Sequence, residues 1–453
     1  MNHDYWLQSL TLNNYRCFDR LEVALDRHLT VLVADNGVGK TSVLDAASVA
    51  LSAFVGAFHN GRRFGISRGD VRLALMPGDI LQMEPQYSCV LEGAGLFYGQ
   101  PVEWQRRMNT PKSSNTYKEA NELIAIGKRL QQQVSDEDQS VAAMLPVMAY
   151  YGTGRLWSEK KVTEKKSYEA EFYTRTAGYL DCLDPSSSYK YFVEWFRFTA
   201  KAHRDLRDQN EQRYGQSGLA MPTPYAALLE GVSLAVDTCL KHTGWHGLRY
   251  SSIHNAPVVE HPQQGVLEVS QLSDGLRNMV ALVADLAYRS TRLNPHLKAE
   301  AAQQTPGIVL IDEIDMHLHP AWQQQVLQQL RAAFPLFQFI VTTHSPQVLS
   351  TIHREQIRVL GKNAEGDFVA AQPVAQSYGR SNADVLQAVM HIEPIPPVDE
   401  SVLLDEYLQW VEQGDLSDPV GAEMETKLKA TLGDDHPELV RLAMVKRRRE
   451  RLG

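Results

Sequence analysis

Residues 307–320 read GIVLIDEIDMHLHP, a short apolar run that ends abruptly in charge. The run from Ile308 to Ile311 follows a glycine and has the length and composition of a central strand in a parallel sheet. Such sheets carry their polar chemistry at the carboxyl ends of the strands, where Asp312 and Glu313 stand. We expect Asp312 to hold the Mg²⁺ of a bound nucleotide and Glu313 to orient and deprotonate the attacking water. A strand end that is merely capped by two carboxylates is the alternative interpretation.

A phosphate-binding loop is the second pattern. Residues 29–33 read LTVLV and predict a strand, residues 34–42 read ADNGVGKTS, and an apolar helical run follows. Backbone N–H groups of such a loop wrap phosphate oxygens, a lysine reaches the outer phosphates and a hydroxyl binds Mg²⁺. Ala34 stands where such a loop usually has its first glycine, so we expect binding to survive and leave the rate of hydrolysis open. The residues expected to contact the nucleotide are Asn36, Gly37, Val38, Gly39, Lys40, Thr41 and Ser42, with Thr41 also a metal ligand.

Three further motifs follow in the chain. Residues 271–277 read QLSDGLR, and their Leu-Ser-x-Gly resembles the signature motif of ABC-type ATPases, although it is also an ordinary helix cap. Asp315 lies where that family has its D-loop, and the strand at residues 337–341 ends in a Thr-Thr-His sequence that resembles the family's switch-histidine loop. The order of phosphate loop, signature, acidic pair and histidine makes coincidence a poor explanation. The resemblance implies that His344 holds the γ-phosphate and water in line.

The resemblance also implies a composite site. In this family Ser273 and Gly275 contact the nucleotide held by the phosphate loop of a second protomer, with Asp315 close by. ATP and Mg²⁺ are then bound between two subunits. The resemblance therefore implies that the active form is a homodimer or a higher oligomer of dimers. We therefore expect Glu313 and His344 to be catalytic, and Asp312 to be a metal ligand.

Several local runs indicate the branch of the family. Residues 10–18 read LTLNNYRCF and resemble the opening strand of SMC-like and RecF-like ATPases. Residues 147–155, 315–320 and 378–386 resemble the PtuA ATPases of Septu antiphage defence, some of which accompany retrons. The resemblance implies an α/β ABC-type P-loop ATPase with an SMC/RecF-like head, an HNH endonuclease as partner, and DNA, RNA or a retron RNA as further candidate ligands.

Length predicts the organisation of the chain. Lys40 and Asp312 lie 272 residues apart, whereas an ABC-type core needs only about half of that, so an insertion must separate two lobes. We expect an amino-terminal ATPase lobe with the phosphate loop at 1–108, a mainly helical insertion at 109–255, a carboxyl-terminal lobe with the signature, acidic pair and histidine at 256–395, and a helical tail at 396–453.

Composition limits the function. The 453 residues carry 45 Lys and Arg against 54 Asp and Glu, and a net charge of −9 argues against a protein that coats nucleic acid. The KRRRER run at 446–451 suits a solvated helix end better than a phosphate-backbone contact. The four cysteines are widely spaced, which favours free thiols in a reducing cytoplasm, and no apolar run is long enough to span a membrane.

Other candidate chemistry is weaker. His317 and His319 have a metal-ligand spacing, but an ordering loop is the better interpretation. Gln86 or Gln82 could be a Q-loop glutamine. No Asp-x-Asp pair follows His344 and no HNH-type cluster occurs, so we expect no nuclease site in this chain.

The sequence therefore predicts an ATP-hydrolysing regulatory subunit of a two-component antiviral complex, which controls an HNH endonuclease by nucleotide state. A standalone SMC-like or RecF-like DNA-repair ATPase is one alternative. A nucleotide-binding scaffold with little turnover, suggested by Ala34, is the other.

Overall fold

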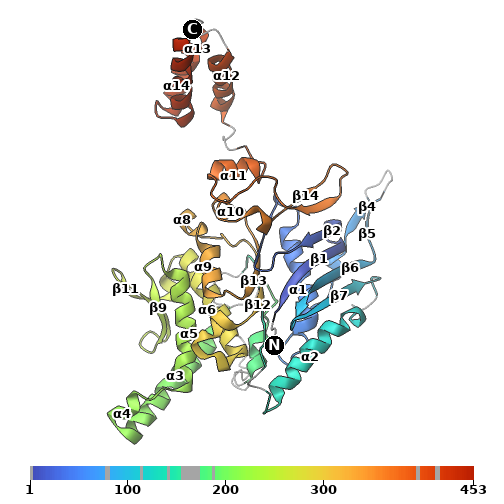
Figure 1. Cartoon of the computed structure of the whole chain (residues 1–453), viewed down its shortest axis with the longest axis vertical. Coiled ribbons are helices and arrows are strands. Elements are labelled where there is room, and N and C mark those ends of the chain that lie inside the picture. The colour runs from blue at the N-terminus through green and yellow to red at the C-terminus, as the bar shows by residue number, and fades with distance from the viewer. Residues whose placement is uncertain are drawn as a thin grey trace. The chain divides into compact units, whose positions relative to one another are not determined.

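The computed structural model divides into two compact units, Met1–Met390 and His391–Gly453. Figure 1 shows the ribbon of the whole chain. The described residues are 4–76, 82–112, 116–139, 143–154, 174–185, 189–393, 398–413 and 419–452.

A six-stranded sheet forms the centre of the first unit. Its strand order is β15-β14-β3-β13-β12-β8, and all neighbours are parallel except β14 and β15. Four of its strands are buried at every residue, which explains why their sequences are continuous apolar runs instead of alternating ones. The bounds are β3 Leu29–Val33, β8 Val147–Tyr151, β12 Gly307–Ile311, β13 Phe337–Thr342, β14 Ile357–Lys362 and β15 Phe368–Ala371.

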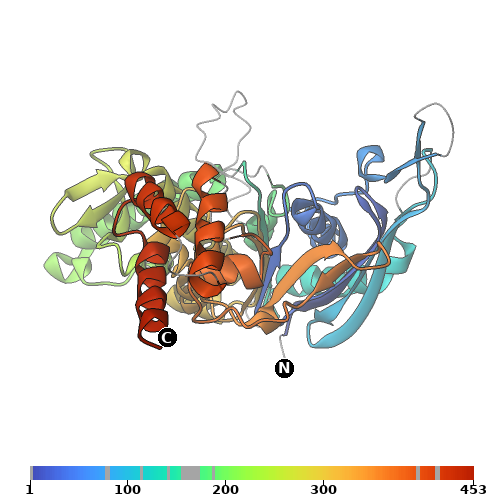
Figure 2. The ribbon, with the colours of Figure 1, turned by 90° about the horizontal axis from the view of Figure 1, so that it is seen from above.

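A second, antiparallel sheet has the order β2-β1-β6-β7. Helix α1 (Lys40–Val55) lies between the two sheets, in contact with β1, β6 and β7 on one side and with β12 and β13 on the other (Figure 2). Because both sides are covered, α1 is buried almost throughout, and its small and branched residues allow the sheets to approach. The strands are β1 Trp6–Tyr15, β2 Phe18–Ala24, β6 Cys89–Phe97 and β7 Gln100–Met108, and α2 Asn121–Ser135 packs on α1 and β7.

The other side of the central sheet carries a helical layer. Helix α6 (Asp274–Leu293) is buried along most of its length and packs against α5 and β8. A three-stranded antiparallel sheet, β11-β10-β9, packs on α3 and α5. The bounds are α3 Lys190–Tyr214, α5 Pro224–Leu240, α9 Val326–Ala333, β9 His246–Ser251, β10 Ala256–His261 and β11 Gly265–Glu268.

Short elements complete the first unit. They are β4 Leu73–Leu75, β5 Met83–Pro85, α4 Gln216–Leu219, α7 Ala301–Gln304, α8 Pro320–Gln323, α10 Pro346–Leu349 and α11 Asn382–Ala388.

The second unit is a three-helix bundle of α12 Asp399–Gln413, α13 Pro419–Leu432 and α14 Pro437–Leu452. Its own core consists of Leu404, Tyr407, Val411, Leu428, Leu439 and Leu442. The basic run of α14 is partly engaged within the bundle, because Lys446 pairs with Glu425 at 3.0 Å and Arg449 donates to the Val411 carbonyl at 2.6 Å. Arg447, Arg448 and Arg451 are exposed.

The segment 109–255, predicted to be an insertion, is not separate from the sheet. It contains α2 and α3, as its helical pattern suggested, but it also supplies β8, which lies beside β12. The four-part division remains a prediction. All four cysteines are free thiols, as predicted. Over the described ranges, no helix combines the length and hydrophobicity needed to cross a bilayer.

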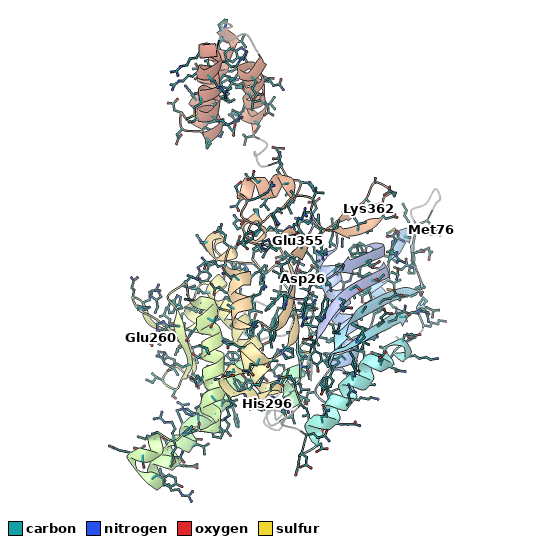
Figure 3. The ribbon with its side chains drawn as sticks, in the orientation of Figure 1. Asp26, Met76, Glu260, His296, Glu355 and Lys362 are labelled. Carbon is teal, nitrogen blue, oxygen red and sulfur yellow. The ribbon has the colours of Figure 1, made fainter. Side chains whose placement is uncertain are left out.

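One buried glutamine joins the two sheets. The Gln338 amide in β13 accepts from the Leu7 N–H at 2.8 Å and donates to the carbonyls of Leu7 and Asp26, both at 2.8 Å (Asp26 is labelled in Figure 3). Its side chain is almost fully buried. It therefore satisfies three backbone groups where the sheets meet, at a place where water cannot replace it.

We expect Gln338→Leu to lower the free energy of unfolding by about 3 kcal/mol, because the three backbone groups lose their partner while the apolar volume is kept. Urea denaturation followed by tryptophan fluorescence measures this. The exposed Gln328 on α9 provides the matched control, Gln328→Leu, which should stay within about 0.5 kcal/mol of the native chain. Equal effects of the two changes would contradict the assigned role.

Candidate functional site

The phosphate loop lies between β3 and α1 and needs glycine at two positions. Gly37 and Gly39 have φ of +81° and +108°. A Cβ on Gly39 would also lie 2.5 Å from Phe18 Cζ and 2.7 Å from Cys17 Sγ, so the loop is pressed against the turn that follows β1. Ala34 is not at positive φ, and its Cβ therefore causes no backbone strain. The loop is consequently preformed, with residues 35–37 exposed.

Lys40 reaches back over this loop. Its Nζ donates to the carbonyls of Ala34 at 2.9 Å and Asp35 at 3.3 Å. Burial lowers the pKa of the Lys40 ammonium below its ordinary value, and nearby carboxylates, Asp312 first and then Glu313, oppose that shift. Neutral carbonyls are weak partners for a cation, so the charge is available to a phosphate group placed in the loop.

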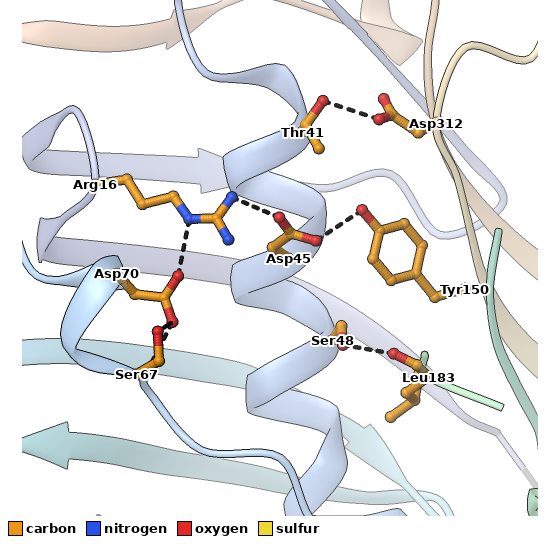
Figure 4. Close-up of polar contacts among 9 residues, drawn as sticks. All are labelled: Arg16, Thr41, Asp45, Ser48, Ser67, Asp70, Tyr150, Leu183 and Asp312. Carbon is orange, nitrogen blue, oxygen red and sulfur yellow. Dashed lines mark hydrogen bonds and ion pairs between the residues drawn. The ribbon is translucent and has the colours of Figure 1, made fainter. Parts of the chain in front are cut away.

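Asp312 lies at the end of β12 between two hydroxyl groups. Thr41 Oγ1 donates to its Oδ2 at 2.8 Å (Figure 4). Thr342 Oγ1 donates to its Oδ1 at 2.6 Å. The Asp312 N–H donates to the Tyr151 carbonyl at 2.8 Å. Asp312, with an exposed fraction of 2%, is thus held by partners on three different elements, two of them at its carboxylate and one at its backbone N–H.

The oxygen donors fit a magnesium ion. Neighbouring ligands of an octahedral Mg²⁺ lie about 2.9 Å apart, given bonds of about 2.0–2.1 Å. The Thr41 hydroxyl and the nearer Asp312 oxygen are 2.8 Å apart. No group of three His, Cys, Asp or Glu side chains suited to a metal occurs in the described parts of the chain, so the remaining ligands would be phosphate oxygens and water.

Glu313 is in an uncommon backbone conformation. Its φ is +47°, and its N–H donates to Thr342 Oγ1 at 2.7 Å, while the next N–H, of Ile314, donates to the Thr342 carbonyl at 3.0 Å. Left-handed conformations are costly for a residue with a Cβ and tend to occur where function requires them. These two bonds, both accepted by Thr342, hold the reversal in place directly after Asp312.

The loop that carries His344 is fixed to the segment after the acidic pair. Thr343 Oγ1 donates to Asp315 Oδ1 at 2.5 Å. Ser345 Oγ donates to Gln323 Oε1 at 2.7 Å, and the Gln323 amide donates to the Leu318 carbonyl at 2.9 Å. His344, which is half-buried, lies between these two anchors. The structure therefore brings together the loops after β12 and β13, which are neighbouring parallel strands.

The signature residues form a second group. Ser273 is the exposed N-cap of α6, and a Cβ on the buried Gly275 would lie 2.4 Å from the His317 carbonyl. Glycine is thus required at 275 by contact within the same chain. In the described residues, no hydrogen bond joins Ser273 or Gly275 to residues 34–42, and α1 and α6 lie on opposite sides of β12 and β13 (Figures 1 and 2).

The lesser candidates have ordinary roles. His319 accepts from the Ala321 N–H at 3.3 Å and so caps α8, while His317 is exposed at φ +62°. Gln86 donates to the Glu84 carbonyl at 3.0 Å. Among the described residues, neither Gln82 nor Gln86 bonds to residues 34–42 or 312–315, so the identity of a Q-loop glutamine remains a prediction.

Sequence reasoning missed the residues that hold the expected ones in place. Thr342 binds both Asp312 and Glu313, and Arg16 pairs with Asp45 at 2.5 Å on α1 and with Asp70 at 2.9 Å (Figure 4). Two consecutive threonines at the end of a buried strand were the available signal for Thr342. No local pattern marks Arg16 and Asp45, since 29 residues separate them.

The comparisons agree with the motifs. The chain matches the model "AAA domain" over residues 9–212 and the model "AAA domain, putative AbiEii toxin, Type IV TA system" over residues 200–350. It is 28% identical to the retron Ec83 probable ATPase of Escherichia coli, over 96% of this chain and 85% of that protein. It is 37% identical to the Septu protein PtuA of Bacillus mycoides, over 25% of this chain and 15% of that protein.

Among solved structures, the Smc head domain of Pyrococcus furiosus bound to the C-terminal domain of ScpA aligns with a TM-score of 0.46 and 13% identity, over 81% of this chain and 96% of that one. The AAA-domain matches and the two relatives confirm the resemblance to PtuA-like and retron-associated ATPases. The fold is that of an α/β P-loop ATPase, as predicted.

We expect Thr342→Val to weaken the binding of Mg²⁺, raising the Mg²⁺ concentration at the midpoint of Mg²⁺-dependent binding of a fluorescent ATP analogue about tenfold. The reason is that Asp312 loses a donor and the Glu313 N–H loses its acceptor. Thr30→Val is the matched control, because Thr30 is equally buried and its hydroxyl also accepts a backbone N–H, that of Asp26. An unchanged midpoint, or the same shift in Thr30→Val, would show that Thr342 only stabilises the fold.

Proposed function

On the basis of this kinship, we propose that the chain is the ATP-hydrolysing, regulatory subunit of a two-component antiviral complex in the cytoplasm, and that its nucleotide state controls an HNH endonuclease partner. The observation that supports this most directly is the meeting of the phosphate-loop helix with the ends of β12 and β13, where Thr41 and Thr342 both bind Asp312. A capped strand end would need only one of these contacts.

Each residue has a defined part in the proposed reaction. Lys40 and the N–H groups of residues 36–42 bind the phosphates of ATP, and Lys40 stabilises the charge that develops on them. Thr41 and Asp312 hold Mg²⁺, which neutralises phosphate charge when bound. Glu313 accepts a proton from the attacking water, and His344 keeps that water in line with the γ-phosphate. The described hydrogen bonds from Thr342 keep Asp312 and the Glu313 backbone in register.

The site is completed by a second copy of the chain in this proposal. Ser273 is exposed at the amino end of a 20-residue helix, where N–H groups and the helix dipole favour an anion. It has no bond to its own phosphate loop, so its natural ligand is a phosphate held by another protomer. Asp315, which accepts from the Thr343 hydroxyl, lies two residues before His317, whose carbonyl faces Gly275. A lone subunit would bind ATP and hydrolyse it poorly.

The nuclease partner follows from the likeness to PtuA and not from the coordinates. No nuclease site is proposed in this chain. A protein that is acidic overall, with net charge −9, is better suited to regulating a partner that holds nucleic acid than to binding it extensively alone.

Complementation tests the shared site. Lys40→Ala removes the phosphate contact and Ser273→Arg blocks the signature turn, so each variant alone should lose ATP turnover. A mixture in equal amounts forms mixed dimers with one intact site, and should recover about a quarter of the native rate if subunits pair at random. Phosphate release measures this, with light scattering to confirm the dimer. Ser270→Arg, an equally exposed change three residues earlier, should remain active.

An inactive mixture, from variants that are folded and dimeric, would overturn the shared site. ATP binding without phosphate release by the native chain would favour the scaffold alternative. ATP-dependent DNA binding by this chain alone would favour the DNA-repair alternative.

The control of the nuclease is tested with the co-purified pair and a plasmid. We expect Glu313→Gln to bind ATP without hydrolysing it and so to hold the complex in its ATP state. The rate of plasmid cleavage by this variant should then differ by at least about tenfold between ATP and ADP. The native complex should alternate between these two cleavage rates as it hydrolyses ATP. Lys40→Ala should fix cleavage at the nucleotide-free level. Cleavage that is the same with ATP, with ADP and without this subunit would rule out regulation.

A further inference from the structure

Strand β8 carries two consecutive tyrosines that bind opposite layers of the molecule. The Tyr150 hydroxyl donates to Asp45 Oδ1 of α1 at 2.8 Å, and the Tyr151 hydroxyl donates to Asp285 Oδ2 of α6 at 2.7 Å. Successive side chains of a strand point to opposite faces of the sheet, so one strand holds both helices. Neither tyrosine has a part in the proposed hydrolysis.

On one face, Tyr150 contributes to a set of anchors along α1. Thr41, Asp45 and Ser48 lie three or four residues apart and share one side of that helix. Thr41 binds Asp312, Asp45 binds Tyr150 and Arg16, and Ser48 Oγ donates to the Leu183 carbonyl at 3.0 Å (Figure 4). The position of the phosphate-loop helix is therefore set from β8 as well as from the metal-site carboxylate.

On the other face, Tyr151 enters a fully buried ion pair. Asp285 Oδ2 also accepts from Arg289 Nε at 2.7 Å, and Arg289 Nη1 donates to the carbonyls of Gly178 at 2.8 Å and Leu180 at 3.1 Å. Both charged side chains are 2% exposed. A buried charge that loses a hydrogen-bond partner is costly, so this cluster has little freedom to rearrange without moving α6.

The backbone of β8 links the two faces to the catalytic edge. Tyr151 pairs with Ile311, and its carbonyl accepts from the Asp312 N–H at 2.8 Å. The Tyr150 N–H donates to the Cys182 carbonyl at 2.7 Å, in the same 178–185 segment that Ser48 and Arg289 bind. A displacement of α1 or of Asp312 is thus transferred to a strand that also holds α6.

We propose that Tyr150 and Tyr151 are positioning residues that couple the phosphate-loop helix to the helix that begins at Ser273. The consequence for regulation rests on the proposed function: ATP in the loop of one protomer sets the alignment of its own Ser273, and hence the second nucleotide site. The coupling gives a physical role to the two tyrosines of a run that served only as a family resemblance.

The test is a crossover measurement that needs no nucleotide. Hydrogen–deuterium exchange is followed in the full chain carrying Tyr150→Phe or Tyr151→Phe. Each change removes one hydroxyl that bonds to one of the two helices. If the helices are coupled, hydrogen exchange should also become faster in the helix to which that hydroxyl does not bond. We expect Tyr150→Phe to speed exchange in α6, and Tyr151→Phe to speed exchange in α1, by about tenfold, the size expected when a hydrogen bond to a charged group is lost.

Two controls separate coupling from general loosening. Tyr407→Phe removes a tyrosine–carboxylate bond of the same kind, to Glu425 at 2.9 Å, in the other unit. Tyr288→Phe removes a buried hydroxyl of α6 that has no hydrogen-bond partner within the described structure. Both should leave exchange in α1 and α6 unchanged. Effects of Tyr150→Phe confined to α1, or equal effects in the controls, would overturn the proposal.

A second readout uses turnover. Tyr151→Phe should leave the dissociation constant for ATP within about twofold and lower kcat about tenfold, because binding uses the phosphate loop and turnover also needs an aligned Ser273. Equal loss of binding and turnover, or no loss of either, counts against the coupling. A native chain without turnover would refute the proposed hydrolysis, and the exchange measurement would still decide the coupling.

Discussion

The Asp312 carboxylate is the point on which the organisation of the first unit depends. Its two oxygens accept from hydroxyls of Thr41 and Thr342, residues that lie 271 positions before it and 30 positions after it in the chain. A carboxylate with an exposed fraction of 2% is stable only when such donors are present, so the three elements must meet. The same contacts set the geometry of a phosphate loop facing a metal ligand.

Helix α1 makes that meeting possible. It is buried on nearly all sides because it lies between two sheets, and its polar residues are therefore confined to positions where a partner exists. Thr41, Asp45 and Ser48 each meet a partner on the central sheet or the segment beside it. Arg16, from the turn after β1, binds Asp45 from the other sheet. The helix thus connects the two sheets through charge and hydrogen bonds as well as through packing.

The proposed site residues fall into two groups. The phosphate loop leads into α1, which lies on one side of β12 and β13, and Ser273 precedes α6, which lies on the other side (Figures 1 and 2). In the proposed function the second group comes from another copy of the chain, so that nucleotide occupancy would report assembly. The likeness to PtuA and to a retron ATPase supports an ATPase in antiphage defence, and the three helices after residue 390 form a separate compact unit.

The central strands, the phosphate loop and the order of the motifs were predictable, because buried parallel strands are apolar runs and glycine at positive φ is a local requirement. The partners of the site residues were not. Thr342 and Arg16 act through contacts between distant segments, and β8 lies in a region that resembled an insertion. Hydrogen bonds among buried groups depend on which faces of the helices and sheets come into contact. Those contacts are decided only when the layers pack, because hydrophobic periodicity and residue propensity describe one helix or strand at a time.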